Sequence, residues 1–153
     1  MTATGIIPLP NAAATEAVGR VLAPLLREGD VVALFGDLGA GKTSLARGVL
    51  AALGLAEEAP SPTFAIVQPY APPEVALPVA HVDLYRIEEP EDAEELGLDE
   101  LLEDGALLVE WPERLGAALW PDALRLVIEP DGQGGRRLTW EAPAAWEGRW
   151  PPR

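Results

Sequence analysis

Short apolar runs, separated by glycine, proline and charged residues, account for much of this chain. The run 31–35 is aliphatic with a terminal phenylalanine and is followed at once by glycine, which is typical of a strand buried on both faces of a parallel sheet. The run 106–110 has the same character but ends on a carboxylate, Glu110. The pattern therefore predicts two central strands of one sheet.

Apolar residues at helical spacing predict two helices. The first covers 11–26, with Asn11 as its N-cap, and the second covers 42–53. A short acidic helical region is expected over 89–103, interrupted at Gly97.

Further strands are expected where apolar residues alternate between turn signals. The segments 63–70 and 78–85 predict a hairpin-like pair, and 124–129 with 136–141 predict two later strands around the turn 131–135. The prolines of 59–62 exclude regular structure there. The tail 142–153, rich in tryptophan and proline, is expected to pack loosely or fray.

Composition restricts the chemistry. The chain is 48% hydrophobic and 24% charged, and no run approaches the roughly 18 apolar residues of a membrane span. No basic residue precedes the apolar run 5–10, so we expect a cytoplasmic protein without a secretory signal. With no cysteine and one histidine, His81, any metal must be held by oxygen.

The net charge of -14 argues against direct binding of a nucleic acid, because binding to the phosphate backbone relies on Lys and Arg. If RNA is involved, a partner should hold it. The stretch from Glu88 to Asp104 is densely acidic. Charge alone fits a docking face and a solvated helix surface equally well.

The turn after the first central strand carries the candidate chemistry. Residues 36–43 read Gly-Asp-Leu-Gly-Ala-Gly-Lys-Thr, which fits the P-loop pattern between a strand and a helix. Glycines let backbone N–H groups surround phosphate, and the following helix adds its positive end. Lys42, the only lysine of the chain, would reach the β- and γ-phosphates, and the Thr43 hydroxyl would bind Mg²⁺. The predicted nucleotide-binding residues of this segment are Gly36, Gly39, Ala40, Gly41, Lys42, Thr43 and Ser44.

A P-loop requires a carboxylate at the end of a neighbouring strand to complete the Mg²⁺ site. Glu110 stands in such a position, although a strand-end Glu can also be an ordinary exposed residue. Asp83 is a second candidate, on a segment that also fits a solvated edge strand. His81 fits a structural or a functional role, and Ser61-Pro62-Thr63 could form a switch loop that senses the γ-phosphate.

These elements predict a single domain over 1–153 of the α/β class. We expect a three-layer P-loop NTPase-like fold with a mostly parallel central sheet, containing the strands that end at Phe35 and Glu110, and an antiparallel portion from 63–85.

Five motifs in order resemble the TsaE family, over about residues 6–128. They are Gly36 to Thr43, Ser61 to Phe64, His81 to Arg86, Glu95 to Leu98, and Glu110 to Pro112. The resemblance implies an ATPase that works with TsaD-like and TsaB-like proteins to make threonylcarbamoyladenosine beside the anticodon of tRNA, supporting turnover by that partner complex.

The resemblance also implies residue roles. Lys42 and Thr43 would bind phosphate and Mg²⁺, Glu110 would complete the Mg²⁺ site, Asp83 would be required for hydrolysis, and Thr63 would lie in the switch-like loop. Trp111 is similar to a functional tryptophan of the family beside the Mg²⁺ ligand, and Asn11 aligns with a segment near the adenine.

Other functions share a P-loop. A small-molecule kinase needs a second substrate pocket with several arginines, for which Arg86 and Arg114 are the obvious mid-chain candidates. A GTPase needs a further lysine to read guanine, and none remains after Lys42. A docking module that binds ATP without hydrolysing it has the same sequence signature as a slow ATPase.

Overall fold

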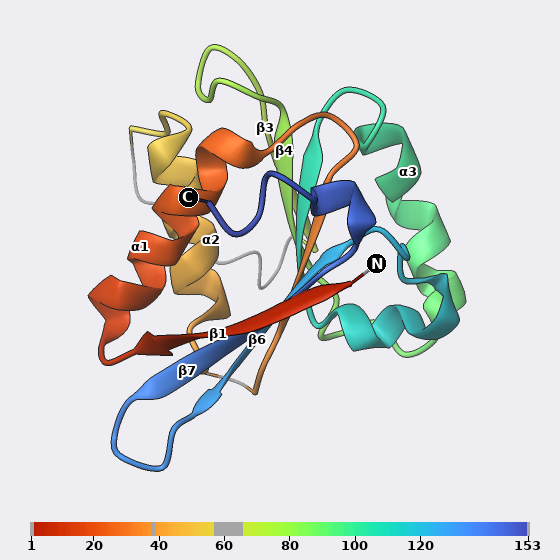
Figure 1. The fold of residues 1–153 in the computed structure, drawn as a ribbon. Helices are drawn as coiled ribbons and strands as arrows, with labels where there is room; N and C mark the ends of the chain where they lie inside the picture. Colours follow the sequence, from red (N-terminus) through yellow and green to blue (C-terminus); the bar gives the residue numbers. More distant parts are fainter. Residues whose placement is uncertain (1, 38, 57–65, 153) are drawn as a thin grey trace.

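The computed structural model of the chain describes residues 2–37, 39–56 and 66–152. Within these ranges the strands form one seven-stranded sheet in the order β1-β7-β6-β2-β5-β4-β3 (Figure 1). The strands are β1 Ala3–Leu9, β2 Val31–Phe35, β3 Val67–Tyr70, β4 Val79–Asp83, β5 Ala106–Glu110, β6 Leu124–Pro130 and β7 Arg136–Ala142. The α-helices are α1 Ala12–Leu22, α2 Lys42–Ala52 and α3 Leu98–Leu101, and the 3₁₀ helices are η1 Ala23–Leu25, η2 Pro90–Leu96, η3 Pro112–Ala118 and η4 Ala144–Trp146.

The centre of the sheet is parallel, as the sequence predicts. β2 pairs in parallel with β5 and β6, and β4 pairs in parallel with β5. Ala33 lies opposite Val109, so the two strands predicted to be central are direct neighbours. The outer pairs β1–β7, β6–β7 and β3–β4 are antiparallel. The predicted mixed α/β sheet, mostly parallel with an antiparallel portion, is confirmed.

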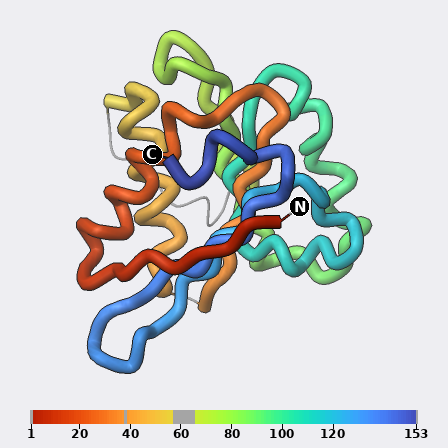
Figure 2. Tube along the Cα trace, in the orientation of Figure 1, coloured from red at the N-terminus to blue at the C-terminus, as the bar shows by residue number. Residues whose placement is uncertain are grey.

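Helices cover both faces of this sheet (Figures 1 and 2). On one face, Leu45 and Val49 of α2 pack with Leu34 and Leu108. On the other, η2, α3 and η3 contribute a second cluster that includes Ala93, Leu98 and Leu115. Because side chains alternate along a strand, Leu107 and Val109 belong to this second cluster.

The helices α1 and α2 lie unusually close together. A Cβ atom built on Gly19 would clash with the carbonyl oxygen of Leu45, and one on Gly48 would clash with that of Glu16. Glycine at both positions therefore lets the two backbones touch. This contact fixes the start of α2 beside Thr15 in the first turns of α1.

Two elements differ from the sequence-based expectation. β1 is an edge strand that the sequence did not indicate, since only one of its faces is covered and Pro8 interrupts its apolar run. The segment predicted as helix 11–26 divides into α1 and η1, because Pro24 cannot continue the α-helical hydrogen bonds. The segment 63–65 of the predicted hairpin lies outside the described residues.

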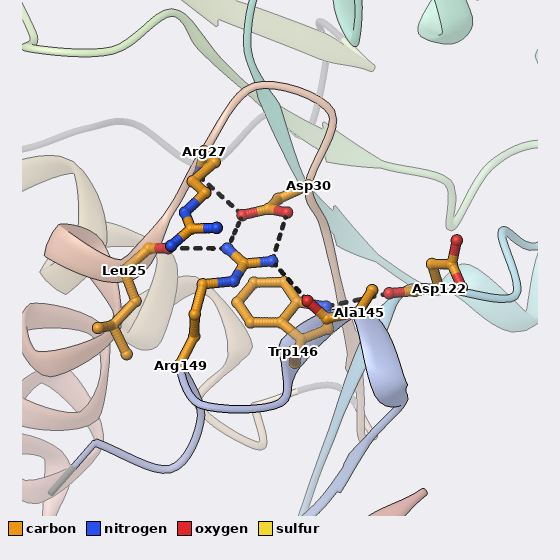
Figure 3. Close-up of polar contacts among 7 residues, drawn as sticks. All are labelled: Leu25, Arg27, Asp30, Asp122, Ala145, Trp146 and Arg149. Atoms are coloured by element: carbon orange, nitrogen blue, oxygen red, sulfur yellow. Dashed lines mark hydrogen bonds and ion pairs between the residues drawn. The ribbon is translucent and has the colours of Figure 1, made fainter. Parts of the chain in front are cut away.

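The expectation of a loosely packed C-terminal tail is wrong. The side chains of Trp146 and Trp150 are buried, and the Trp150 ring meets Trp140 edge-on at 6.3 Å between centroids. Figure 3 shows how Arg149 anchors this segment: its guanidinium makes two hydrogen bonds to the Asp30 carboxylate, at 2.7 and 3.1 Å. The pattern of the tail could not indicate this anchoring, since Asp30 lies more than a hundred residues from Arg149 in sequence.

None of the helices in the described ranges is long and apolar enough to cross a bilayer.

Candidate functional site

The P-loop joins β2 to α2 in the predicted order. Gly39 and Gly41 have φ of 77° and 112°, a region that L side chains rarely adopt, so these positions require glycine. The Lys42 ammonium folds back over the loop and donates a hydrogen bond to the Gly36 carbonyl at 2.6 Å. The backbone thereby curls at the positive end of α2, which is the geometry that binds phosphate.

Two carboxylates face the P-loop from neighbouring strands. Asp83 at the end of β4 lies opposite Glu110 at the end of β5. The Thr43 hydroxyl lies 3.2 Å from Oε1 and 3.1 Å from Oε2 of Glu110. Parallel strands end at the same edge of the sheet, which explains why residues distant in sequence meet beside the first turn of α2.

A cavity of about 340 Å³ opens between these groups. Its lining combines P-loop residues with the strand-end carboxylates and with the residues that follow each strand. The lining residues are Gly39, Ala40, Gly41, Lys42, Thr43, Ser44, Asp83, Tyr85, Arg86, Glu110 and Trp111. The P-loop side thus carries the Lys42 cation, and the strand side carries the carboxylates of Asp83 and Glu110 together with the Arg86 guanidinium.

Lys42 is buried, with 4% of the residue exposed. Burial lowers the pKa of its ammonium, and the negative charges of Glu110, Glu113, Asp83 and Asp37 oppose this shift. An anion in the P-loop would therefore replace solvation that the ammonium has lost.

Trp111 covers one side of Lys42. The Lys42 Nζ lies 3.7 Å from the centroid of the Trp111 ring, a cation–π contact. Trp111 is the non-glycine residue of the described chain with positive φ, at 57°, so the backbone turns sharply after Glu110 and directs this ring back over the loop. Tyr85 supports the ring from the turn that follows β4, at 4.9 Å between centroids.

Asp83 sits in a partly buried position where its charge is disfavoured. Burial raises the pKa of the Asp83 carboxyl, the backbone N–H of Tyr85 opposes this shift by donating to it at 2.9 Å, and the Glu110 charge adds to the increase. A cation placed between the two carboxylates would relieve both effects.

His81 lies deeper beneath the same face of the sheet. It is fully buried, and its Nε2 is 2.6 Å from Oε2 of Glu110. β4 is an internal strand between β3 and β5, so the reading of this segment as a solvated edge strand is wrong. β3 pairs with the outer side of β4, in agreement with the hairpin-like pair predicted from 63–70 and 78–85.

The donor set suits magnesium. No group of three or more His, Cys, Asp or Glu side chains gathers as a metal cage in the described chain. Magnesium is commonly held by one or two carboxylates together with substrate phosphates and water, and prefers oxygen ligands. The Thr43 hydroxyl and the Glu110 carboxylate offer such ligands beside the P-loop.

Most of the predicted site residues meet in this cavity. Gly36 and Asn11 are not among its lining residues, although the Gly36 carbonyl accepts the hydrogen bond of Lys42. Thr63 lies outside the described residues. Asn11 caps α1 by accepting a hydrogen bond from the Ala14 N–H at 2.9 Å, and it is not part of the described cavity lining. Its contact with adenine therefore stays a prediction. Sequence reasoning did not place Tyr85 and Arg86 in the site, although both belong to the His81–Arg86 motif that should have suggested them.

Comparison with known proteins gives a consistent match. Residues 9–138 match the sequence model of the family described as Threonylcarbamoyl adenosine biosynthesis protein TsaE. The chain is 38% identical over 133 residues to the tRNA threonylcarbamoyladenosine biosynthesis protein TsaE of Bacillus subtilis, covering 86% of this chain and 82% of that protein. It is 44% identical over 113 residues to the protein of the same name from Streptomyces coelicolor, covering 73% and 76%.

The fold matches as well. The crystal structure of Bacillus subtilis YdiB superimposes with a TM-score of 0.78 at 32% identity, over 93% of this chain and 87% of that one.

Proposed function

The chain belongs to the TsaE family of threonylcarbamoyl adenosine biosynthesis proteins, and from that premise we propose that it binds and hydrolyses Mg-ATP to support this modification of tRNA. The observation that carries the proposal is the convergence of Lys42, Thr43, Asp83 and Glu110 on one cavity. These residues come from three separate elements, so their meeting is a property of the fold.

Each residue has a defined task in the proposed site. Backbone N–H groups of the P-loop and the Lys42 ammonium bind the β- and γ-phosphates. The Thr43 hydroxyl and the Glu110 carboxylate hold the magnesium ion, which neutralises charge on the phosphates when it is bound. The Trp111 ring would lie on the side of the Lys42 ammonium away from the phosphates and shield it from water. The positive charge of Lys42 would then act mainly on the phosphates.

Asp83 serves hydrolysis in this proposal. Its carboxylate lines the cavity next to Glu110, and its raised pKa gives it a greater affinity for a proton than an ordinary aspartate has. It would orient the attacking water by accepting a hydrogen bond from it. Thr63 would contribute from the switch-like loop, and Asn11 would approach the adenine from the start of α1.

The chemistry on tRNA would occur on partners, which we propose are TsaD-like and TsaB-like proteins. With a net charge of -14, the chain itself is poorly suited to hold RNA. ATP binding or hydrolysis would change the loops around the cavity, and the partner complex would sense that change. Such a complex would act in the cytoplasm, where tRNA is modified.

The acidic stretch from Glu88 to Asp104 is the proposed docking face. η2 and α3 bury Ala93 and Leu98 against the sheet, while Glu94, Glu95 and Glu100 are exposed. The carboxylates therefore point to solvent, where a basic partner surface could meet them.

Turnover measurements with and without partners test the proposal. The isolated protein should hydrolyse ATP slowly, and the assembled complex should do so faster, with both rates reduced by Glu110→Ala and Asp83→Ala. Binding of ATP without hydrolysis in either state would favour a docking module. Phosphorylation of a small molecule would favour a kinase, and fast turnover without partners would contradict the partner-dependent role.

A further inference from the structure

His81 is the only histidine of the chain, and it is one of few buried polar residues in the part of the chain that the structure describes. On its own face of the sheet, Val79 of β4 and Leu108, its register partner on β5, are apolar and buried. An imidazole in such surroundings is unfavourable unless it is hydrogen-bonded. Its hydrogen bond goes to Glu110, the carboxylate that the proposed function assigns to magnesium.

The two oxygens of Glu110 have different partners. Oε2 lies 2.6 Å from His81 Nε2 and 3.1 Å from the Thr43 hydroxyl. Within the described residues, Oε1 is approached by the Thr43 hydroxyl alone, at 3.2 Å. The imidazole therefore engages Oε2 and leaves Oε1 as the oxygen with fewer partners.

We propose that His81 is a positioning residue, which donates its Nε2–H to Oε2 of Glu110 and so presents Oε1 to magnesium. Within residues 2–37, 39–56 and 66–152, Nδ1 has no hydrogen-bond partner. A proton on Nε2 leaves only a lone pair without a partner at Nδ1, which is less unfavourable than a buried N–H in that position. This inference rests on the proposed function, because it concerns the orientation of the proposed metal ligand.

A histidine that merely fills space in the core would give a different result from one that orients Glu110. His81→Gln keeps an N–H donor at a similar distance from the backbone, whereas His81→Met has similar length and no donor. Comparing these two variants separates the hydrogen bond from the packing.

The first experiment requires no variant. Protein labelled with ¹⁵N-histidine gives one pair of ring nitrogen signals, because the chain has one histidine. A proton-bearing Nε2 supports the proposal. An unprotonated Nε2 with the proton on Nδ1 overturns it, since Nε2 could not then donate to Glu110.

The second experiment titrates Mg²⁺ at a fixed concentration of a fluorescent ATP analogue. We expect His81→Met to raise the Mg²⁺ concentration for half-maximal binding by about 10-fold, the typical effect of losing a hydrogen bond to a metal ligand. His81→Gln should restore most of that loss, and the metal-free affinity of both variants should match the wild type. Equal Mg²⁺ dependence in all three proteins would overturn the proposal.

A failure of the proposed function can be told apart from a failure of the role proposed for His81. If wild-type protein binds the nucleotide without any Mg²⁺ dependence, Glu110 is not a magnesium ligand, yet the nitrogen signals still report whether His81 donates to it. If the wild type shows Mg²⁺-dependent binding and the variants do not differ, only the role of His81 is wrong.

Discussion

Replacing Arg149 by alanine should destabilise the protein strongly, although the residue lies in a proline-rich tail. The Arg149 guanidinium contacts Asp30 through two hydrogen bonds and also donates to the carbonyls of Leu25, at 2.9 Å, and Ala145, at 3.1 Å. It stacks over the Trp146 ring at 4.3 Å. Each side chain of the ion pair is only 11% exposed. Removing one partner from a buried pair costs about 3–5 kcal/mol, and the residual exposure places this change near 3 kcal/mol.

Urea unfolding of wild type and Arg149→Ala measures this loss as a lower midpoint at unchanged slope. A chain of this size should also lose roughly 6–12 °C in melting temperature. Asp30→Asn should be similarly destabilising, and the double variant should lose less than the sum of the two. The matched control is Arg137→Ala, which removes an Arg–Glu pair that is 46% and 44% exposed, and should change stability by less than about 1 kcal/mol. Equal effects of Arg149→Ala and Arg137→Ala would refute the view that the tail is anchored.

Three further predictions concern the fold and its surface. Burial raises the pKa of Asp83, so its negative charge lowers the stability of the fold at pH values above the ordinary pKa of an aspartate. Asp83→Asn should therefore raise the melting temperature at neutral pH. This gain should shrink as the pH falls through the raised pKa and vanish below the ordinary pKa. Gly48→Ala should lower stability by about 1–3 kcal/mol in urea unfolding, because its Cβ would push α1 away from α2. Charge reversal at Glu94, Glu95 and Glu100 should weaken co-purification with the partner complex without changing ATP affinity in calorimetry; unchanged assembly would remove the docking face and leave the ATPase proposal intact.

The central strands were predictable because burial on both faces leaves a local pattern. The runs 31–35 and 106–110 are almost wholly apolar, and a parallel sheet is the structure that covers both of their faces. The P-loop was predictable because glycine is required where the backbone turns through positive φ. Glu110 could be placed because it ends a buried strand, so its side chain must emerge at the edge of the sheet.

What sequence reasoning missed depends on partners far along the chain. β1 is stable only because β7 offers it an edge, and Pro8 interrupts its own apolar run. The tail packs because Asp30 and Trp140 receive it, and no local pattern records those contacts. The hydrogen bond from His81 to Glu110 likewise depends on the register of β4 against β5.

Calorimetric titration of Mg-ATP into wild type and Lys42→Ala tests the central claim most directly. A unit charge pair about 4 Å apart, at an effective dielectric near 20, interacts by roughly 4 kcal/mol before desolvation is subtracted. We therefore expect one saturable site in the wild type and a loss of affinity on the order of 100-fold, or about 2.7 kcal/mol, in Lys42→Ala. Arg20→Ala, which removes an exposed cation on α1, is the matched control and should bind as the wild type does. Unchanged Mg-ATP affinity in Lys42→Ala would contradict the assignment of residues 36–43 as the nucleotide site.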